Sequence, residues 1–214
     1  MEDYQAWEKY PRHRNWFNKL WVAERLGHVC GPSGVAPKET NQYIVRPIYN
    51  LAGMGIGARF QIIEAGDMRA IEPGYFWCER FYGRHISASF KFHHGVKGEW
   101  KPVSAFEGFQ DFRDPLTKFK EWYKLGLDWV PEVPRELNDL SDVNIINVEF
   151  VNGKVIEVHL RDTPDPKYDH FIPVWASDFG VKKQYMEENN FDFVESYDDA
   201  DGHLEDPRIG FLVK

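Results

Sequence analysis

Residues 154–161 carry groups that could do chemistry, at a spacing that suits a β-strand. Glu157, His159 and Arg161 stand two positions apart with apolar residues between them. Because successive side chains of a strand point to opposite faces, these three share one face. A carboxylate and an imidazole can ligate a divalent cation, and an arginine beside them adds a positive clamp for phosphate. This face is a candidate site, with Glu157 and His159 as metal ligands.

A second carboxylate reaches this region from the preceding strand. Asn152-Gly153 predicts a two-residue turn within a hairpin over 143–160. With that turn, Glu149 pairs with Ile156 and lies diagonal to Glu157. Two carboxylates and a neutral imidazole suit a hard divalent cation bridged to phosphates. The alternative is a surface strand with ordinary charge pairs.

Closely spaced glycines follow a strand pattern that contains Arg46. Gly53, Gly55 and Gly57 leave backbone N–H groups free to approach phosphate oxygens. The stretch is not a P-loop, because no Gly-Lys-Ser/Thr follows, and it is not a dinucleotide fingerprint, because it leads into a strand rather than a helix. A phosphate-binding loop and a plain hairpin loop both remain open.

The elements that must position these groups indicate an α+β fold built on antiparallel sheets. Apolar spacing near 3.6 predicts a helix over 15–26 that Gly27 ends, and Asp114 begins a second helix pattern that runs to Leu125. The C-terminal fifty residues read as acidic and irregular. Strand patterns cover 43–48, 59–64, 75–81, 84–92, 143–151 and 154–160.

Composition narrows the classes of function. The chain has 214 residues, which predicts one domain or two small lobes, and its net charge of −8 argues against nucleic acid as a partner. Cys30 and Cys78 cannot make a disulfide framework. With no signal peptide and no apolar run near 18 residues, we expect a cytoplasmic protein without a membrane partner.

Taken in order, several segments resemble the ATP-grasp superfamily of ATP-dependent carboxylate ligases. Residues 18–27 resemble the opening helix, with Lys19 where a phosphate-binding lysine lies. Ile44-Val-Arg-Pro47 resembles the Val-Lys-Pro strand, with Arg46 in place of lysine, and a glycine-rich flap follows. Residues 76–83 resemble the hinge that holds adenine by backbone groups.

The same resemblance extends to the late hairpin. Residues 148–150 and 156–161 resemble the paired strands that carry magnesium ligands and usually end in Glu-x-Asn-x-Arg. His159 stands for the asparagine, and His85 stands where a glutamate is frequent. The resemblance implies a ligase in which ATP and a divalent metal activate a carboxylate as an acyl phosphate, which an amine or another nucleophile attacks.

The resemblance also assigns residues to roles. Arg46 and Arg161 would be catalytic, with Arg161 stabilising the charge of the acyl phosphate. Glu149, Glu157 and His159 would hold Mg²⁺ or Mn²⁺. The nucleotide-binding residues that it implies are Lys19, Arg46, Gly53, Gly55, Gly57, Cys78, Glu79 and Phe81.

The expected architecture is two small ATP-grasp-like lobes of antiparallel sheets flanked by helices. Residues 1–17 would be a polar leader, 18–77 the small lobe with the glycine loop, and 78–214 the large lobe with the metal hairpin. The N-terminal domain that usually precedes this region is absent, so a protein partner or a homo-oligomer would complete the substrate site. The alternative is a non-catalytic protein that kept the scaffold for nucleotide binding or structural interaction.

Overall fold

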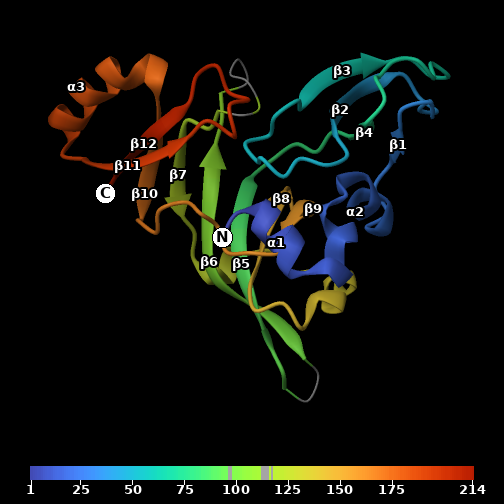
Figure 1. The fold of residues 1–214 in the computed structure, drawn as a ribbon, viewed down its shortest axis with the longest axis horizontal. Helices are drawn as coiled ribbons and strands as arrows, with labels where there is room; N and C mark the ends of the chain where they lie inside the picture. Colours follow the sequence, from blue (N-terminus) through green and yellow to red (C-terminus); the bar gives the residue numbers. More distant parts are fainter. Residues whose placement is uncertain (96–97, 112–115, 117) are drawn as a thin grey trace.

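Two antiparallel sheets form the framework of the computed structural model, which describes residues 1–95, 98–111, 116 and 118–214 (Figure 1). The α+β class and the antiparallel sheets expected from the sequence are confirmed. The smaller sheet has the order β1-β4-β2-β3, and the larger has the order β11-β12-β10-β7-β6-β5-β8-β9. The described helices are α1 (Asp3–Lys9), α2 (Lys19–Arg25) and α3 (Phe179–Asn189), with 3₁₀ turns η1 (Pro11–Phe17), η2 (Leu127–Trp129), η3 (Arg135–Leu140) and η4 (Ala176–Asp178).

The smaller sheet is a hairpin with two further strands beside it. Its strands are β1 (Cys30–Pro32), β2 (Asn41–Pro47), β3 (Arg59–Ile63) and β4 (Tyr75–Glu79), which confirms the three strands predicted between 43 and 81. Alternate residues of β2 turn inward, so Tyr43 and Val45 join Ile63 and Trp77 in a buried cluster. The glycine-rich stretch links β2 to β3 as a long loop.

In the larger sheet, β5 (His85–His93) pairs with both β6 (Glu99–Phe109) and β8 (Ile146–Val151). The hairpin of β8 and β9 (Lys154–His159) confirms the strands and the Asn152-Gly153 turn predicted for it. The remaining strands are β7 (Glu121–Lys124), β10 (His170–Trp175), β11 (Asp192–Asp198) and β12 (Arg208–Val213).

Two predictions about the second half of the chain are wrong. Of the helix predicted over 114–125, Asp114 and Pro115 lie outside the described residues, and 121–124 form β7. Trp122 of β7 stacks on Phe171 of β10. Packing against this distant strand, rather than the local helix pattern, therefore determines that 121–124 form a β-strand. The C-terminal fifty residues, expected to be irregular, contribute β10, α3, β11 and β12.

The predicted helix over 15–26 begins later than the periodicity suggests. Asn18 caps α2, because its side-chain oxygen accepts a hydrogen bond from the backbone N–H of Trp21 at 2.9 Å. Residues 11–17 form η1 instead. This cap places Lys19 at the first helical position, with its side chain buried.

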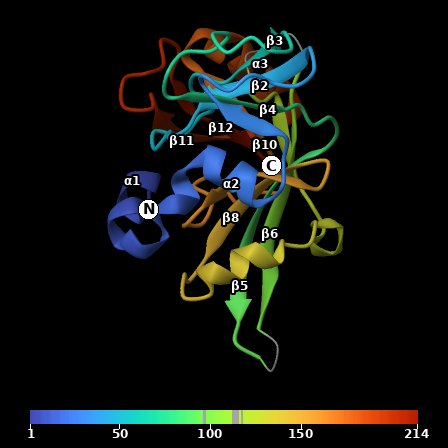
Figure 2. The same ribbon diagram turned by 90° about the vertical axis from the view of Figure 1, so that its right-hand side faces the viewer.

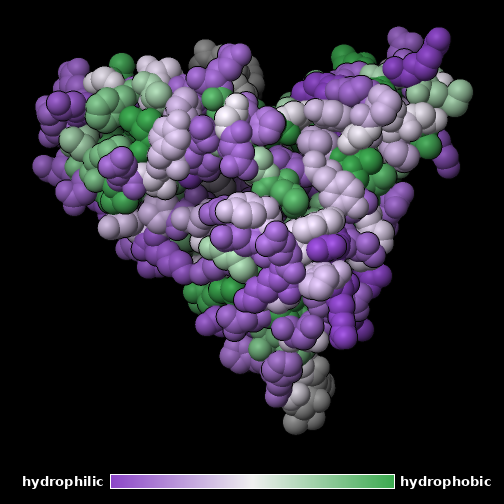
Figure 3. Space-filling model, viewed as in Figure 1, coloured by the Kyte–Doolittle hydropathy of each residue, from purple (hydrophilic) through white to green (hydrophobic). Residues whose placement is uncertain are grey.

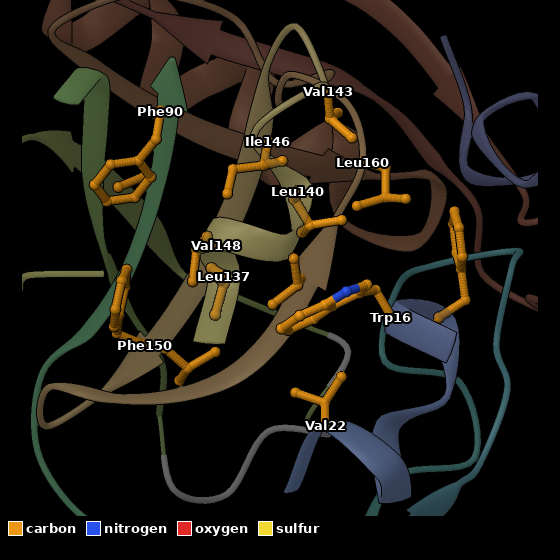
Figure 4. Close-up of a cluster of buried hydrophobic side chains, with 14 of the residues drawn as sticks. Trp16, Val22, Phe90, Leu137, Leu140, Val143, Ile146, Val148, Phe150 and Leu160 are labelled. Carbon is orange, nitrogen blue, oxygen red and sulfur yellow. The ribbon is translucent and has the colours of Figure 1, made fainter. Parts of the chain in front are cut away.

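The N-terminal 17 residues, expected to be a polar leader, fold as α1 and η1 and pack on the hairpin of β8 and β9. Figure 4 shows Trp16 and Val22 beside Leu140, Ile146 and Leu160 in one buried cluster. Figures 1 and 2 show α2 between the smaller sheet and this hairpin, so one short helix touches both sheets. In the described part of the chain, no helix has the length and apolarity to cross a membrane.

Candidate functional site

A cavity of about 760 Å³ lies where the two sheets meet. Figure 3 shows the surface hollowed between the lobe of β1–β4 and the lobe that holds α3. Of the residues that the sequence singled out, Gly57 does not line the cavity. Those that do are Lys19, Arg46, Gly53, Gly55, Cys78, Glu79, Phe81, Glu149, Glu157, His159 and Arg161.

Glu157 joins positive groups from two separate elements. The Lys19 ammonium lies 2.6 Å from one of its oxygens, and Nη1 of Arg46 lies 3.9 Å from the other. Lys19 comes from the first turn of α2 and Arg46 from β2. The two cations therefore converge although they are 27 positions apart in the sequence (46 − 19 = 27). All three side chains are largely buried, which strengthens the attraction between their charges.

Arg46 is held in place but is not fully used. Its Nη2 donates to the carbonyl oxygen of Ile156 at 2.5 Å, and its guanidinium lies over the ring of Phe76 at 5.5 Å. Its Nε is buried without a hydrogen-bond partner. A buried donor that has no acceptor is destabilising, so Arg46 keeps hydrogen-bonding capacity that the described residues do not use.

A β-bulge sets the geometry of the carboxylates. Val151 pairs with Lys154, as a two-residue turn requires, but the register shifts after Phe150, and Glu149 pairs directly with Glu157. The prediction that Glu149 lies opposite Ile156 is therefore wrong by one residue. The extra residue on the second strand brings both carboxylates to one face, which is a recurrent use of bulges near functional sites.

One ring nitrogen of His159 lies near both carboxylates, and Asp3 holds the other ring nitrogen. Its Nε2 is 3.8 Å from Glu149 and 3.7 Å from Glu157, and its Nδ1 donates to Asp3 at 2.9 Å. Burial by itself would lower the pKa of His159, but the Asp3 carboxylate and Glu157 raise it to about 10. The ring is therefore an imidazolium at neutral pH.

Asp3 also holds Arg161. Arg161 Nε and Nη2 donate to the two oxygens of Asp3 at 2.8 and 3.0 Å, in a bidentate pair. Burial opposes ionisation, yet His159 and Arg161 hold the pKa of Asp3 well below its usual range. Sequence reasoning did not find Asp3, because a single acidic residue in a short N-terminal helix carries no motif.

His85 faces Glu149 from β5. Its Nε2 lies 3.3 Å from a Glu149 oxygen, and its ring packs edge-on against Phe119. Burial would raise the pKa of Glu149, but the neighbouring rings of His159 and His85 lower it well below its usual range. The resemblance places a glutamate at position 85, so a basic residue here replaces an acidic one.

The glycine loop approaches the cavity through backbone that suits glycine. Gly53, Gly55 and Gly57 all have φ between +62° and +74°. A Cβ at Gly57 would lie 2.6 Å from the Tyr75 hydroxyl, whereas a Cβ at Gly53 would meet nothing within 4 Å. The tip is also touched by the C-terminal strands, since Arg208 Nη1 lies 3.8 Å from the Met54 sulfur.

The predicted adenine hinge lies along one wall of the cavity. Cys78 and Glu79 end β4, and the backbone N–H of Glu79 already donates to Val29 at 2.8 Å. Phe81 packs edge-on against His28 with ring centroids 4.9 Å apart.

The far end of the cavity contains residues that sequence reasoning missed. Aromatic rings of Phe119, Trp122 and Phe211 line it, together with the buried Arg208. Nη1 of Arg208 lies 3.8 Å from Asp165, and burial raises the pKa of that carboxyl. Arg208 and Phe211 come from β12, in the C-terminal segment whose acidic composition concealed its strands, and Trp122 comes from β7.

Whether the site can hold a metal ion depends on the donor groups that line it. Among residues 1–95, 98–111, 116 and 118–214, no cluster of three His, Cys, Asp or Glu side chains is arranged to hold a metal ion. Mg²⁺ at nucleotide sites commonly needs only one or two protein carboxylates beside phosphate oxygens, and Glu149 and Glu157 fit that requirement. His159 does not fit while its ring carries both protons.

No protein-family model matches the sequence, and no curated protein matches it. Among solved structures, the chain is similar to the ADP complex of PurK, an N5-carboxyaminoimidazole ribonucleotide synthetase, with TM-score 0.57, 11% identity, and coverage of 98% of this chain and 72% of that one. It is similar to a carboxyaminoimidazole ribonucleotide synthase from Aspergillus clavatus complexed with ATP, with TM-score 0.55, 10% identity, and coverage of 98% and 73%.

A putative ATP-grasp superfamily protein from Archaeoglobus fulgidus also matches, with TM-score 0.41 and 15% identity over 70% of this chain. The chain spans 47% of the length of that protein. The likeness to the two synthetase structures, with TM-scores of 0.57 and 0.55, confirms the fold expected from the sequence resemblance. The chain has the ATP-grasp type of fold.

Proposed function

We propose that the cavity binds ATP and that the protein is an ATP-dependent ligase that activates a carboxylate as an acyl phosphate. The observation that carries this proposal is the convergence of Lys19, Arg46 and Glu157 beside a glycine loop, in a fold whose similar structures were solved with ADP or ATP. Two cations and backbone N–H groups on a loop suit the phosphates of a nucleotide.

In this proposal, Lys19 and Arg46 leave the Glu157 carboxylate and pair with the phosphate groups of ATP instead. Arg46 keeps its positive charge and offers a planar fork of donors, so it can replace a lysine at a phosphate. Gly53, Gly55 and Gly57 let the loop close over the phosphates. Cys78, Glu79 and Phe81 line the adenine side.

Glu149 and Glu157 would hold a divalent cation, Mg²⁺ or Mn²⁺, together with phosphate oxygens. The cation would neutralise charge on the phosphates when it is bound. Lys19 and His85, which now contact these carboxylates, would have to give way. His159 would become a third ligand only after its ring loses a proton.

Arg161 would stabilise charge on the acyl phosphate, as a donor that the fold already positions. Its two donors are now held by Asp3, so substrate must share or displace that carboxylate. We place the protein in the cytoplasm. A partner chain or a second copy would complete the site for the carboxylate and its nucleophile.

The direct test is equilibrium ATP binding followed by ADP release with mixtures of small carboxylates and amines. Wild-type protein is expected to bind ATP and to release ADP only when a carboxylate is present. Glu157→Gln should reduce metal-dependent binding, and Asp169→Asn, a change on the exposed surface, is the matched control. Binding without ADP release under any mixture would support the non-catalytic alternative, and no binding would reject both.

A further inference from the structure

Two free cysteines lie directly opposite each other in the smaller sheet. Cys30 of β1 and Cys78 of β4 are register partners in an antiparallel pair. Directly opposite residues have side chains on the same face of a sheet. The two thiols therefore face the same layer of the structure although 48 positions separate them (78 − 30 = 48).

The hydrogen bonds on either side define the type of pair. The N–H of Glu79 donates to the carbonyl of Val29 at 2.8 Å, and the N–H of Ser33 donates to that of Tyr75 at 3.1 Å. Hydrogen-bonded and non-hydrogen-bonded pairs alternate along an antiparallel ladder, so the cysteine pair is of the non-hydrogen-bonded type. Cα atoms in such pairs lie about 4.5 Å apart, inside the range of about 4.4 to 6.8 Å that a disulfide accepts.

The surroundings distinguish the two thiols. Cys78 is buried and Cys30 is half-buried, in an apolar cluster with Ala23, Phe76 and Ile44. Cys30 is therefore the more exposed of the two thiols and the one that an oxidant reaches first. Neither thiol has a role in the metal and phosphate chemistry proposed above, although Cys78 also lines the cavity.

We propose that Cys30 and Cys78 form a reversible cross-strand disulfide by exchange with a low-molecular-weight disulfide such as glutathione disulfide. The Cys30 thiolate attacks one sulfur of glutathione disulfide and releases one glutathione thiolate, which leaves a mixed disulfide on Cys30. The Cys78 thiolate then attacks the Cys30 sulfur and releases the second glutathione thiolate. Two protein thiols are oxidised, one disulfide is reduced to two thiols, and the two thiol protons pass to the released glutathione.

The first step is slowed mainly by burial of the thiols and also depends on the neighbouring charges. Burial, with Glu24 of α2 and Glu79 of β4, raises the pKa of Cys30 to about 11. Burial raises the pKa of Cys78 to about 12, and Arg46 of β2 opposes that shift. Because the thiolate is the nucleophile, the disulfide should form slowly at neutral pH and faster as the pH rises.

The bond would change stability without moving the strands. It would join β1 to β4 across a segment that contains β2, β3 and the glycine loop. Closing a segment of this length restricts the unfolded chain, and the strands are already paired in the folded state. The oxidised protein should therefore melt about 5 to 10 °C above the reduced protein.

The test is incubation of the folded protein with glutathione disulfide at mildly alkaline pH, followed by peptide mapping without reduction. The expected product links the Cys30 and Cys78 peptides, carries no glutathione, and returns to two thiols with dithiothreitol. Cys78→Ser should instead keep glutathione on Cys30, and Cys30→Ser should not react while folded.

Protein unfolded in urea with the same reagent shows that the oxidant is competent. If that sample is oxidised while the folded wild type keeps two thiols, or accumulates a stable glutathione adduct or a linked dimer, the proposal is wrong. The readout needs no nucleotide, so its failure and the failure of the ATP proposal are independent.

Discussion

Asp3 and Arg161 form a bidentate ion pair, with nitrogen–oxygen distances of 2.8 and 3.0 Å, between the first helix and the residue that follows the β8–β9 hairpin. Asp3 is only 3% exposed, and it also accepts a hydrogen bond from His159. The N-terminal helix therefore supplies the counter-ion for an arginine and an imidazolium that line the cavity. A segment that looks like a leader in the sequence is part of the site.

Asp3→Asn should destabilise the fold by about 3 to 5 kcal/mol, because it leaves two buried positive groups without their carboxylate. Urea unfolding measures the change. Glu8→Gln, on the exposed side of the same helix, should stay within about 0.5 kcal/mol of wild type. Equal midpoints for Asp3→Asn and Glu8→Gln would show that the buried ion pairs do not stabilise the protein.

The late hairpin shows how far the sequence predicts the site. Alternation and the Asn152-Gly153 turn predict both strands, and the two-residue spacing predicts the shared face of Glu157 and His159. The bulge that aligns Glu149 with Glu157 was not predictable, because nothing in the local pattern distinguishes a bulged residue from a paired one.

Other parts of the fold depend on partners that are distant in the sequence. The segment 121–124 forms a strand because it pairs with β6 and β10 and because Trp122 stacks on Phe171, and a local helix pattern cannot show such packing. Asp3 reaches a partner 158 positions away. Local periodicity therefore predicts the strands of the site, and long-range contacts determine which charged side chains meet there.

Glycine substitutions test the conformation of the loop over the cavity. Gly53→Ala should lower the free energy of unfolding by about 1 to 2 kcal/mol, because a residue with a Cβ is strained in the left-handed backbone conformation found there. Gly57→Ala should cost more, because its Cβ would also lie 2.6 Å from the Tyr75 hydroxyl oxygen. Thermal unfolding of both variants measures the difference.

Tyr75→Phe removes that hydroxyl and should restore part of the stability that Gly57→Ala loses. The same change should not help Gly53→Ala, which has no atom within 4 Å of the new Cβ. Equal losses for both alanine variants, with no rescue, would contradict the loop geometry.

The ionisation of Asp206 should make the free energy of unfolding depend on pH in the acidic range. Its carboxylate accepts hydrogen bonds from Lys118 at 2.5 Å and from Ser177 N and Oγ at 2.9 and 2.6 Å. Burial opposes the shift, yet these groups lower the pKa of Asp206 from 3.8 to about 2. Because the folded pKa is depressed, the stabilisation is present above the unfolded value of 3.8 and is lost as the pH falls toward 2.

Asp206→Asn should therefore lose about 1 to 2 kcal/mol at pH near 7 and should converge on wild type near the folded pKa of about 2. Asp169→Asn is the control, because its partner Lys124 is exposed and the pair should contribute less than about 1 kcal/mol. Chemical unfolding across the pH range gives both curves. A constant difference between wild type and Asp206→Asn would contradict the depressed pKa.

The most direct test of the ATP proposal is the unfolding stability of the protein with saturating ATP, with and without Mg²⁺, compared with each variant's own ligand-free state. At about 100 times the dissociation constant, binding should stabilise the fold by about 2.7 kcal/mol. Lys19→Met should lose this gain, and Lys124→Met, which removes an exposed lysine, should keep it. A gain that Lys19→Met retains in full, or no gain in the wild type, would contradict a nucleotide site in this cavity.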